Sequence, residues 1–150
     1  MKNDKKIDYK IYLAQTDTTV GFLSQDRAKL NAIKGREKDQ KIIRAVKDLA
    51  TLKSFVRVPN AHKAKVRRAK KTTFIYQNGE AIRVVFGDHQ SFFTRLNWAY
   101  STSANRTKER FDETWANDKA DIIALDRRGL FESPPSKIFR LGKTRVIKVR

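Results

Sequence analysis

Cations beside a flexible residue form the first cluster of this sequence that could do chemistry. Lys34-Gly35-Arg36 sets an ammonium and a guanidinium on either side of a glycine. Such a pair can hold a phosphate, because lysine acts as a point charge and arginine as a two-pronged donor. The structural alternative is that both cations only complement the negative end of a predicted helix. We therefore treat this cluster as a candidate phosphate clamp.

Small hydroxyl and amide residues form the other candidate clusters, each placed at the end of a predicted strand. Residues 16–21 read TDTTVG and residues 101–105 read STSAN. Side chains at the end of a strand can donate hydrogen bonds to a polar ligand. Ser103 and Asn105 could bind a phosphate, a carboxylate or the water shell of magnesium. In both clusters the alternative is a turn made of ordinary turn-forming residues.

Missing residue types and motifs narrow the chemistry further. The chain has no cysteine, which excludes disulfides, thiolate metal sites and a thiol nucleophile. Its histidines, His62 and His89, lie far apart without metal-ligand spacing, so no tightly bound, protein-ligated metal is expected. No P-loop, dinucleotide-binding glycine pattern or nucleophile elbow occurs. An enzyme with this sequence would work by positioning its substrates and by cationic stabilisation.

The chain is strongly basic, with 34 lysines and arginines against 16 acidic residues and a net charge of +18. No acidic residue occurs between residues 49 and 79. This segment predicts contact with the phosphates of tRNA or double-stranded RNA, and the alternative is a merely solvated basic surface. No aromatic residues are interleaved with its cations, so base stacking is not expected there. The candidate RNA-binding residues are Lys63, Lys65, Arg67, Arg68, Lys70 and Lys71.

The sequence carries no sign of a membrane or secretory destination. No segment approaches the ~18 apolar residues of a membrane span. Residues 1–10 lack the apolar stretch of a signal peptide. Together with the missing cysteine, these observations predict a soluble, cytoplasmic protein without a membrane partner.

Hydrophobic patterning predicts the elements that must position these clusters. Without a linker or an internal repeat, residues 1–150 are expected to form a single domain. Interleaved strands and helices predict an α/β fold, a twisted open mixed sheet flanked by helices. Strands are expected at residues 7–13, 41–46, 72–76, 82–86, 100–103, 122–125, 138–141 and 146–149, with a hairpin at Asn78-Gly79. Helices are expected at residues 25–34 (capped by Ser24 and ended by Gly35), 48–55, 60–70 (preceded by Pro59), 88–96 (capped by Asp88) and around 111–115.

Taken in order, the clusters resemble a known family. TDTxxG, followed by KGR and then by SxSAN, is similar to the pattern of the YrdC/YciO family, whose best-known members are threonylcarbamoyl-AMP synthases. The similarity continues in TTFI at residues 72–75, AIRV at 81–84 and PSKI at 135–138. Arg150 stands where the family has an arginine near its last strand. The resemblance runs from residue 7 to residue 150 and rests on the ordered set rather than on any single motif.

The resemblance implies a YrdC-like fold, a twisted α/β sheet with a large positive concave surface. It also implies a nucleotidyltransferase that makes threonylcarbamoyl-adenylate from L-threonine, bicarbonate and ATP, with magnesium on the ATP, and releases pyrophosphate. Partner proteins of tRNA modification would then move the threonylcarbamoyl group onto an adenosine of tRNA. By resemblance, ATP would be bound by Lys34, Arg36, Ser103, Ser136 and Arg150. The catalytic residues would be Lys34, Arg36, Ser103 and Asn105. L-Threonine would be bound by Thr18, Arg83 and Ser101.

The sequence also departs from the family pattern. Ala14-Gln15 replaces a tyrosine-proline pair before TDT, and Lys137 replaces a threonine. A family histidine has no counterpart among residues 42–46. These changes leave open a second hypothesis, a non-catalytic YrdC-like protein that binds tRNA or double-stranded RNA. A third hypothesis is a ribosome-associated factor that uses its charge structurally.

Overall fold

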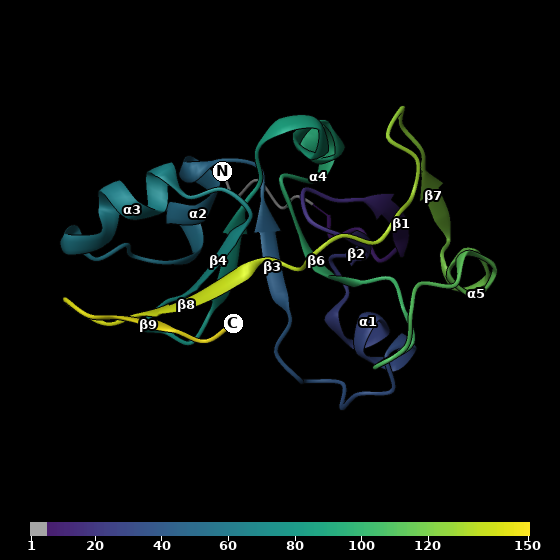
Figure 1. The fold of residues 1–150 in the computed structure, drawn as a ribbon, viewed down its shortest axis with the longest axis horizontal. Helices are drawn as coiled ribbons and strands as arrows, with labels where there is room; N and C mark the ends of the chain where they lie inside the picture. The colour runs from purple at the N-terminus through teal and green to yellow at the C-terminus, as the bar shows by residue number, and fades with distance from the viewer. Residues whose placement is uncertain (1–5) are drawn as a thin grey trace.

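A mixed sheet of nine strands runs through the molecule, and helices flank it (Figure 1). The computed structural model describes residues 6–150, so the first part of the segment 1–10 lies outside the described residues. The strand order is β7-β1-β2-β6-β3-β5-β4-β8-β9, with both parallel and antiparallel neighbours. The predicted class, an α/β fold with a mixed sheet flanked by helices, is confirmed.

The strands at the start of the chain differ from the prediction. β1 (Tyr12–Gln15) pairs antiparallel with β2 (Val20–Ser24), with Leu13 opposite Phe22. The first strand therefore lies later in the sequence than the predicted strand at residues 7–13, and β2 was not predicted. β2 is buried along its whole length. A strand covered on both faces lacks the polar alternation by which strands are recognised.

α1 (Arg27–Ile33) begins at a different cap from the expected one. Asp26 is the N-cap, and its side chain accepts a hydrogen bond from the backbone N–H of Lys29 at 3.1 Å. Ser24, the expected cap, is the last residue of β2 and accepts from the backbone N–H of Asp26 at 2.9 Å. Gly35 has a φ of 65° and follows the helix end, as predicted.

The middle of the chain alternates strands and helices as predicted. β3 (Ile43–Val46) leads into α2 (Leu49–Phe55), which Asp48 caps. The 3-10 helix η1 (Asn60–His62) leads into α3 (Lys63–Arg68), so the α-helix is shorter than the predicted stretch 60–70. Ala69 has extended backbone angles and ends α3.

β4 (Thr72–Ile75) and β5 (Ala81–Val84) form the predicted hairpin. The backbone N–H of Tyr76 donates to the carbonyl oxygen of Glu80 at 2.9 Å and closes the loop. The connection is therefore one residue longer than the two-residue turn that Asn-Gly favours, and Gly79 occupies its left-handed position with a φ of 84°.

A single Asp88-capped helix at residues 88–96 is not what the structure contains. The 3-10 helix η2 (Gly87–Phe92) has no side-chain cap and continues into the one-turn α4 (Phe93–Leu96). Its buried residues, His89 and Phe93, are one turn apart. A long amphipathic helix would need an apolar face that continues over several turns, and only these residues of the segment are buried.

The remaining elements complete the sheet and both of its edges. β6 (Trp98–Ser103) lies between β2 and β3. α5 (Glu113–Lys119) precedes the edge strand β7 (Ile122–Ala124), while β8 (Lys137–Leu141) and β9 (Val146–Lys148) extend the other edge. The connection from β7 to β8 crosses from one half of the sheet to the other (Figure 1).

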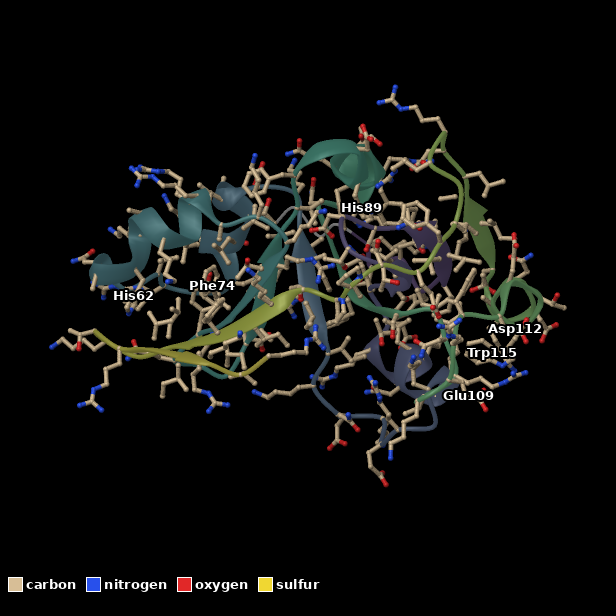
Figure 2. All side chains as sticks on the ribbon, in the orientation of Figure 1. His62, Phe74, His89, Glu109, Asp112 and Trp115 are labelled. Atoms are coloured by element: carbon tan, nitrogen blue, oxygen red, sulfur yellow. The ribbon has the colours of Figure 1, made fainter. Side chains whose placement is uncertain are left out.

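Apolar side chains pack on the sheet in separate clusters, including one in each half (Figure 2). Phe74 and Leu52 belong to one cluster, and Phe22 and Leu30 belong to another, against which Trp115 packs. Fully burying such a side chain contributes about 1.5–3 kcal/mol, so these contacts fix the strand ends that carry the candidate site. In the described part of the chain, no helix is both long enough and apolar enough to cross a membrane.

Candidate functional site

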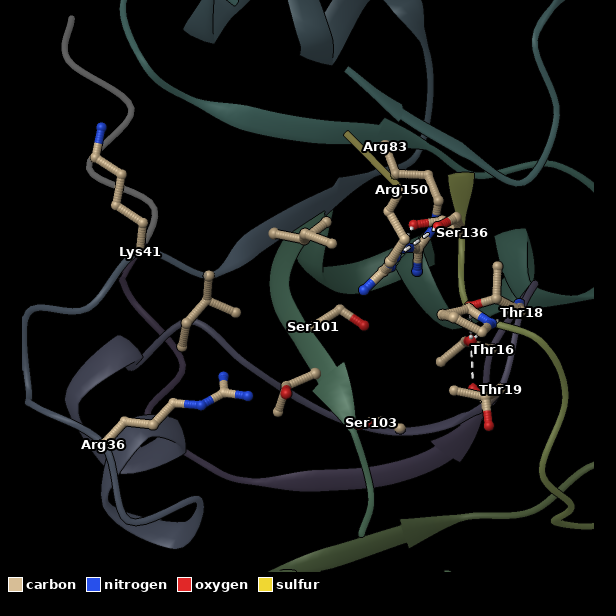
Figure 3. A pocket seen from close by; sticks show the side chains of 15 residues that line it. Thr16, Thr18, Thr19, Arg36, Lys41, Arg83, Ser101, Ser103, Ser136 and Arg150 are labelled. Atoms are coloured by element: carbon tan, nitrogen blue, oxygen red, sulfur yellow. Dashed lines mark hydrogen bonds between the residues drawn. The ribbon is translucent and has the colours of Figure 1, made fainter. Parts of the chain in front are cut away.

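Most of the candidate clusters meet at one cavity of about 250 Å³ (Figure 3). Its walls come from the β1–β2 loop, the loop after α1, strands β5 and β6, and the segments before β8 and after β9. Cations and hydroxyl groups dominate, and none of the described lining residues is acidic or aromatic. The lining residues are Thr16, Thr18, Thr19, Gly21, Arg36, Lys41, Ile42, Ile43, Arg83, Ser101, Thr102, Ser103, Pro135, Ser136 and Arg150.

Threonine hydroxyls shape the β1–β2 loop, which forms one wall. Thr16 Oγ1 donates to the carbonyl oxygen of Thr19 at 2.6 Å and accepts from the backbone N–H of Thr18 at 3.1 Å. Gly21 lets this loop approach β6, because a Cβ there would lie 3.0 Å from both the carbonyl oxygen of Thr102 and the side chain of Thr16. The loop thereby holds the buried Thr18 against the cavity.

Arg83 reaches the cavity from β5 and is held by an acidic partner. Its Nε donates to the carboxylate oxygens of Asp17 at 3.1 and 3.2 Å. The side chains of Arg83 and Asp17 are only 4% and 6% exposed, so the pair is desolvated. The terminal guanidinium nitrogens find no acceptor among residues 6–150, and they remain available for an anion in the cavity.

Arg150 lies beside Arg83, and no acidic residue in the described chain pairs with it (Figure 3). Its Nε donates to the carbonyl oxygen of Ser136 at 3.0 Å, and its Nη2 donates to Ser136 Oγ at 3.3 Å. Ser136 Oγ also lies 2.8 Å from Thr73 Oγ1. Burial, together with the positive charge of Arg83, lowers the pKa of Arg150. Arg83 is paired with Asp17, whereas Arg150 has no acidic partner among the described residues, so the excess positive charge favours the binding of an anion.

Arg36, Lys41 and the serines of β6 form the opposite wall. Arg36 is half-buried in the loop after α1 and points toward β6 (Figure 3). Lys41 Nζ donates to the carbonyl oxygen of Gly79 at 3.2 Å, which ties this loop to the β4–β5 hairpin. Ser101 is buried, whereas Ser103 is exposed at the strand end. Arg36 thus faces the cavity from this side, opposite Arg83 and Arg150 (Figure 3).

Lys34 lies behind the cavity rather than in its wall. Its Nζ donates to the carbonyl oxygen of Ser103 at 2.9 Å and to Asn105 Oδ1 at 3.1 Å. Burial, together with the charge of Arg36, lowers the pKa of Lys34 to about 8. The ammonium therefore fixes the end of β6 and, through it, the position of Ser103. Asn105 borders an adjoining cavity that shares Ser103 and Arg150 with the first.

The sequence matches no protein-family model and no curated protein. Solved structures share its architecture. MTH1692 from Methanobacterium thermoautotrophicum aligns with a TM-score of 0.69 and 17% identity over 94% of this chain and 79% of that one. YciO from E. coli aligns with a TM-score of 0.74 and 17% identity over 95% and 82%. P. abyssi Sua5, solved in complex with L-threonine, aligns with a TM-score of 0.75 and 14% identity over 94% and 50%. The chain has a YrdC-like fold.

The YrdC-like fold confirms the architecture that the ordered motifs predict. Because these solved structures are only 14–17% identical to the chain, the similarity shows the fold alone. The chain spans about half the length of Sua5. In this fold the cavity gathers most of the predicted small-molecule residues, while Lys34 and Asn105 support its rim from outside. The cavity is also lined by residues that were not predicted from the sequence: Thr16, Thr19, Lys41 and Thr102. Thr16 and Thr19 belong to the TDTT run, and Thr102 belongs to STSAN.

The predicted RNA-binding residues lie on a separate part of the YrdC-like fold. They occupy α3 and the loop between α3 and β4, and all of them are exposed. Lys65 Nζ lies 5.4 Å from the ring centroid of Phe139, and none of the group forms an ion pair within residues 6–150. We name Lys63, Lys65, Arg67, Arg68, Lys70 and Lys71 the basic surface.

Proposed function

We propose that the chain is a threonylcarbamoyl-AMP synthase, a nucleotidyltransferase that forms threonylcarbamoyl-adenylate from L-threonine, bicarbonate and ATP. The observation that carries this proposal is the meeting of Arg36, Arg83 and Arg150 with serine and threonine hydroxyls in one cavity without a lining carboxylate. The shared fold with Sua5, whose structure holds L-threonine, supports the proposal. The ordered motifs point to the same substrates.

The proposed chemistry needs fixed positive charge rather than a protein nucleophile. The amine of L-threonine first condenses with bicarbonate, which forms the C–N bond of a carbamate and releases water. An oxygen of this carbamate then attacks the α-phosphorus of ATP, and a new P–O bond forms. The bond from that phosphorus to the bridging oxygen of the β-phosphate breaks, and pyrophosphate leaves. Cations held in place stabilise the negative charge that grows on the phosphoryl oxygens. Arg36 and Arg150 have this role, and Lys34 holds Ser103 behind them.

Arg83, Thr18 and Ser101 form the proposed threonine site. The terminal nitrogens of Arg83 suit a carboxylate, because guanidinium and carboxylate pair through parallel hydrogen bonds. Asp17 holds Arg83 through Nε alone and so orients the fork toward the cavity. Ser136, anchored by Arg150, closes the site from the other side.

Magnesium enters the proposal with ATP. None of the described residues of the cavity wall is a carboxylate. Within residues 6–150, no group of three or more histidine, cysteine, aspartate or glutamate side chains could hold a metal ion. Magnesium prefers oxygen ligands and keeps several waters, so the phosphates, with help from hydroxyls such as Ser103, would supply its coordination.

A pyrophosphate-release assay with ATP, labelled bicarbonate and L-threonine tests the proposal. Release is expected only when all substrates are present, and the label should appear in a threonine-containing adenylate. Arg36→Ala is expected to abolish release without lowering the melting temperature, whereas Arg110→Ala, an exposed arginine outside the cavity, should retain it. Release without threonine, or none from folded protein, would contradict the synthase.

The basic surface favours a second function, the binding of tRNA or double-stranded RNA, either beside synthesis or in its place. Its cations have no acidic partners among the described residues, so their charge is free to meet phosphates. Binding of tRNA there would suit a cytoplasmic synthase that hands its product to tRNA-modification partner proteins. Filter binding of tRNA and of a double-stranded RNA is the direct measurement.

A further inference from the structure

A second cavity of about 440 Å³ lies across the β1–β2 loop from the first. The loop separates them: Arg83 lines the first cavity, its partner Asp17 lines the second, and Thr16 and Thr18 touch both. The other wall of the second cavity comes from the crossing segment between β7 and β8. Arg128 of that segment donates to the carbonyl oxygens of Thr16 and Gln15 at 3.1 and 3.0 Å. These hydrogen bonds hold the two walls of the second cavity together.

His89 lines the second cavity and lacks partners for its polar atoms. The residue is 1% exposed, and neither Nδ1 nor Nε2 has a hydrogen-bond partner in the described chain. Its ring packs against Phe92 and Phe93, with centroids 5.6 and 5.1 Å away. Burial, followed by the charges of Arg83 and Arg128, lowers the pKa of His89 to about 3, so the ring is neutral. A neutral imidazole carries one donor and one acceptor, and leaving them unpaired is destabilising.

Gln15 presents a second unused donor to the same space. It is 2% exposed, and its Oε1 accepts from the backbone N–H of Phe131 at 2.9 Å. Its Nε2 donates to no acceptor among residues 6–150 although Gln15 lines the cavity. This amide is therefore free to donate to a ligand or to water in the cavity. The second cavity therefore gathers polar groups that no protein group satisfies.

The charge balance of the second cavity favours an anion. Its aspartates are already paired, Asp17 with Arg83 and Asp88 with Arg127 at 3.4 Å. Arg128 is neutralised by Asp126. Lys70 and Lys71 line the cavity, are exposed and form no ion pair within residues 6–150. Phe86 and Phe131 form its apolar wall.

We propose that the second cavity binds a small organic anion, a carboxylate or phosphate ester carried on an apolar body. The anionic group lies at Lys70 and Lys71, the apolar body lies against Phe86 and Phe131, and polar atoms of the ligand meet His89 and Gln15. This assignment does not depend on the synthase proposal, because the Asp17–Arg83 pair separates the second cavity from the first.

Titration of the isotope-labelled protein with phenyl phosphate, followed by NMR, tests the assignment. Saturable shifts are expected at the His89 ring and at the amides of Gly87 and Ser133, which line the second cavity. Inorganic phosphate and phenol should each bind more weakly, because each supplies only half of the ligand. Shifts confined to Ser101 and its neighbours in the first cavity, or equal affinity for inorganic phosphate, would overturn the proposal.

Variants separate the cavities. Lys71→Ala is expected to weaken phenyl phosphate binding at the second cavity about tenfold, the usual effect of losing a hydrogen bond to a charged group. Arg36→Ala should leave the Gly87 and Ser133 shifts unchanged. His89→Phe keeps the ring packing, so the protein should fold at least as stably, and the probe should bind more weakly. Unchanged probe affinity in folded His89→Phe would overturn the assignment.

Discussion

The guanidinium of Arg83 and the carboxylate of Asp17 form a buried ion pair that stands between the two cavities. The pair joins β5 to the β1–β2 loop, which lie far apart in the sequence. Through it, the loop that carries the TDT motif also sets the direction of the proposed threonine-binding arginine.

Asp17→Asn tests this dependence. Breaking one side of a buried pair is expected to lower the free energy of unfolding by about 3–5 kcal/mol, because Arg83 is left charged and unpaired in a desolvated site. Urea unfolding measures the loss, and KM for L-threonine should rise in whatever protein remains folded. The double variant Asp17→Asn/Arg83→Gln should recover part of the stability but none of the threonine affinity. A double variant no more stable than Asp17→Asn would contradict the pairing.

Gly21→Ala tests the close approach of the β1–β2 loop to β6. The added Cβ would lie 3.0 Å from the carbonyl oxygen of Thr102, which is backbone and does not move aside easily. Overpacking of this kind is expected to lower stability by about 1–3 kcal/mol and to displace the loop from the cavity. Gly142→Ala is the matched control, because its nearest neighbour lies at 3.6 Å. Equal melting temperatures for the two variants would contradict the steric argument.

Lys34→Met tests the buried ammonium behind β6. The folded-state pKa of Lys34 is lowered from 10.5 to about 8. Between those values the unfolded chain binds more protons at this residue than the folded one, so its contribution to stability rises with pH. As pH increases from 8 to 10, the free energy of unfolding of the wild type is expected to rise relative to that of Lys34→Met, by at most about 1.4 kcal/mol per pH unit. If the free energies of unfolding of the wild type and of Lys34→Met changed equally with pH, the pKa of Lys34 would not be lowered in the folded protein.

Arg150→Gln tests the cation that faces the proposed phosphates. Losing one hydrogen bond to a charged group is expected to raise KM for ATP about tenfold or more, while Ser136 keeps part of its contact with the amide. Arg145→Gln, an exposed residue between β8 and β9, should leave KM unchanged. If the two variants had the same KM, Arg150 would have no part in nucleotide binding.

Arg67→Gln/Arg68→Gln tests the basic surface. Each lost phosphate contact should weaken RNA binding for all sequences alike and reduce the slope of log K against log salt by about 1. Fluorescence anisotropy with tRNA at several salt concentrations measures the slope. Lys143→Gln/Arg145→Gln, a pair of exposed cations outside the basic surface, is the control. An unchanged slope in the first variant would place RNA binding elsewhere.

The sequence predicted the fold class and most of the cavity because ordered motifs of small and cationic residues mark the strand ends that meet there. Arg36 could be recognised from the KGR cluster, whereas Arg83 and Arg150 could be recognised only through the resemblance to the YrdC/YciO family. Lys41 could not, because it sits in a run of charged residues where nothing distinguishes a lining cation from a solvated one. Its place depends on the contact with the β4–β5 hairpin, which is tertiary.

Local sequence patterns did not predict elements whose residues are buried on every side, because such elements lack the alternation of apolar and polar residues. Residues 20–24 form a central strand, yet both faces are covered and no period of two is visible. Lys34 reads as a free cation beside Arg36, whereas its ammonium is occupied by oxygen atoms from the end of β6. The unpaired atoms of His89 have no sequence signature either, because they arise from what the neighbouring segments do not offer.

The first cavity takes one wall from residues 16–21 and another from Ser136 and Arg150. These walls meet only after β8 has joined β4 and β9 has joined β8, at the far side of the sheet from β1. A partly folded chain that kept its helices and its β1–β2 hairpin would therefore have no ligand site. A ligand that touches both walls would bind only when β8 and β9 are in place, and binding kinetics during refolding would follow the docking of these strands.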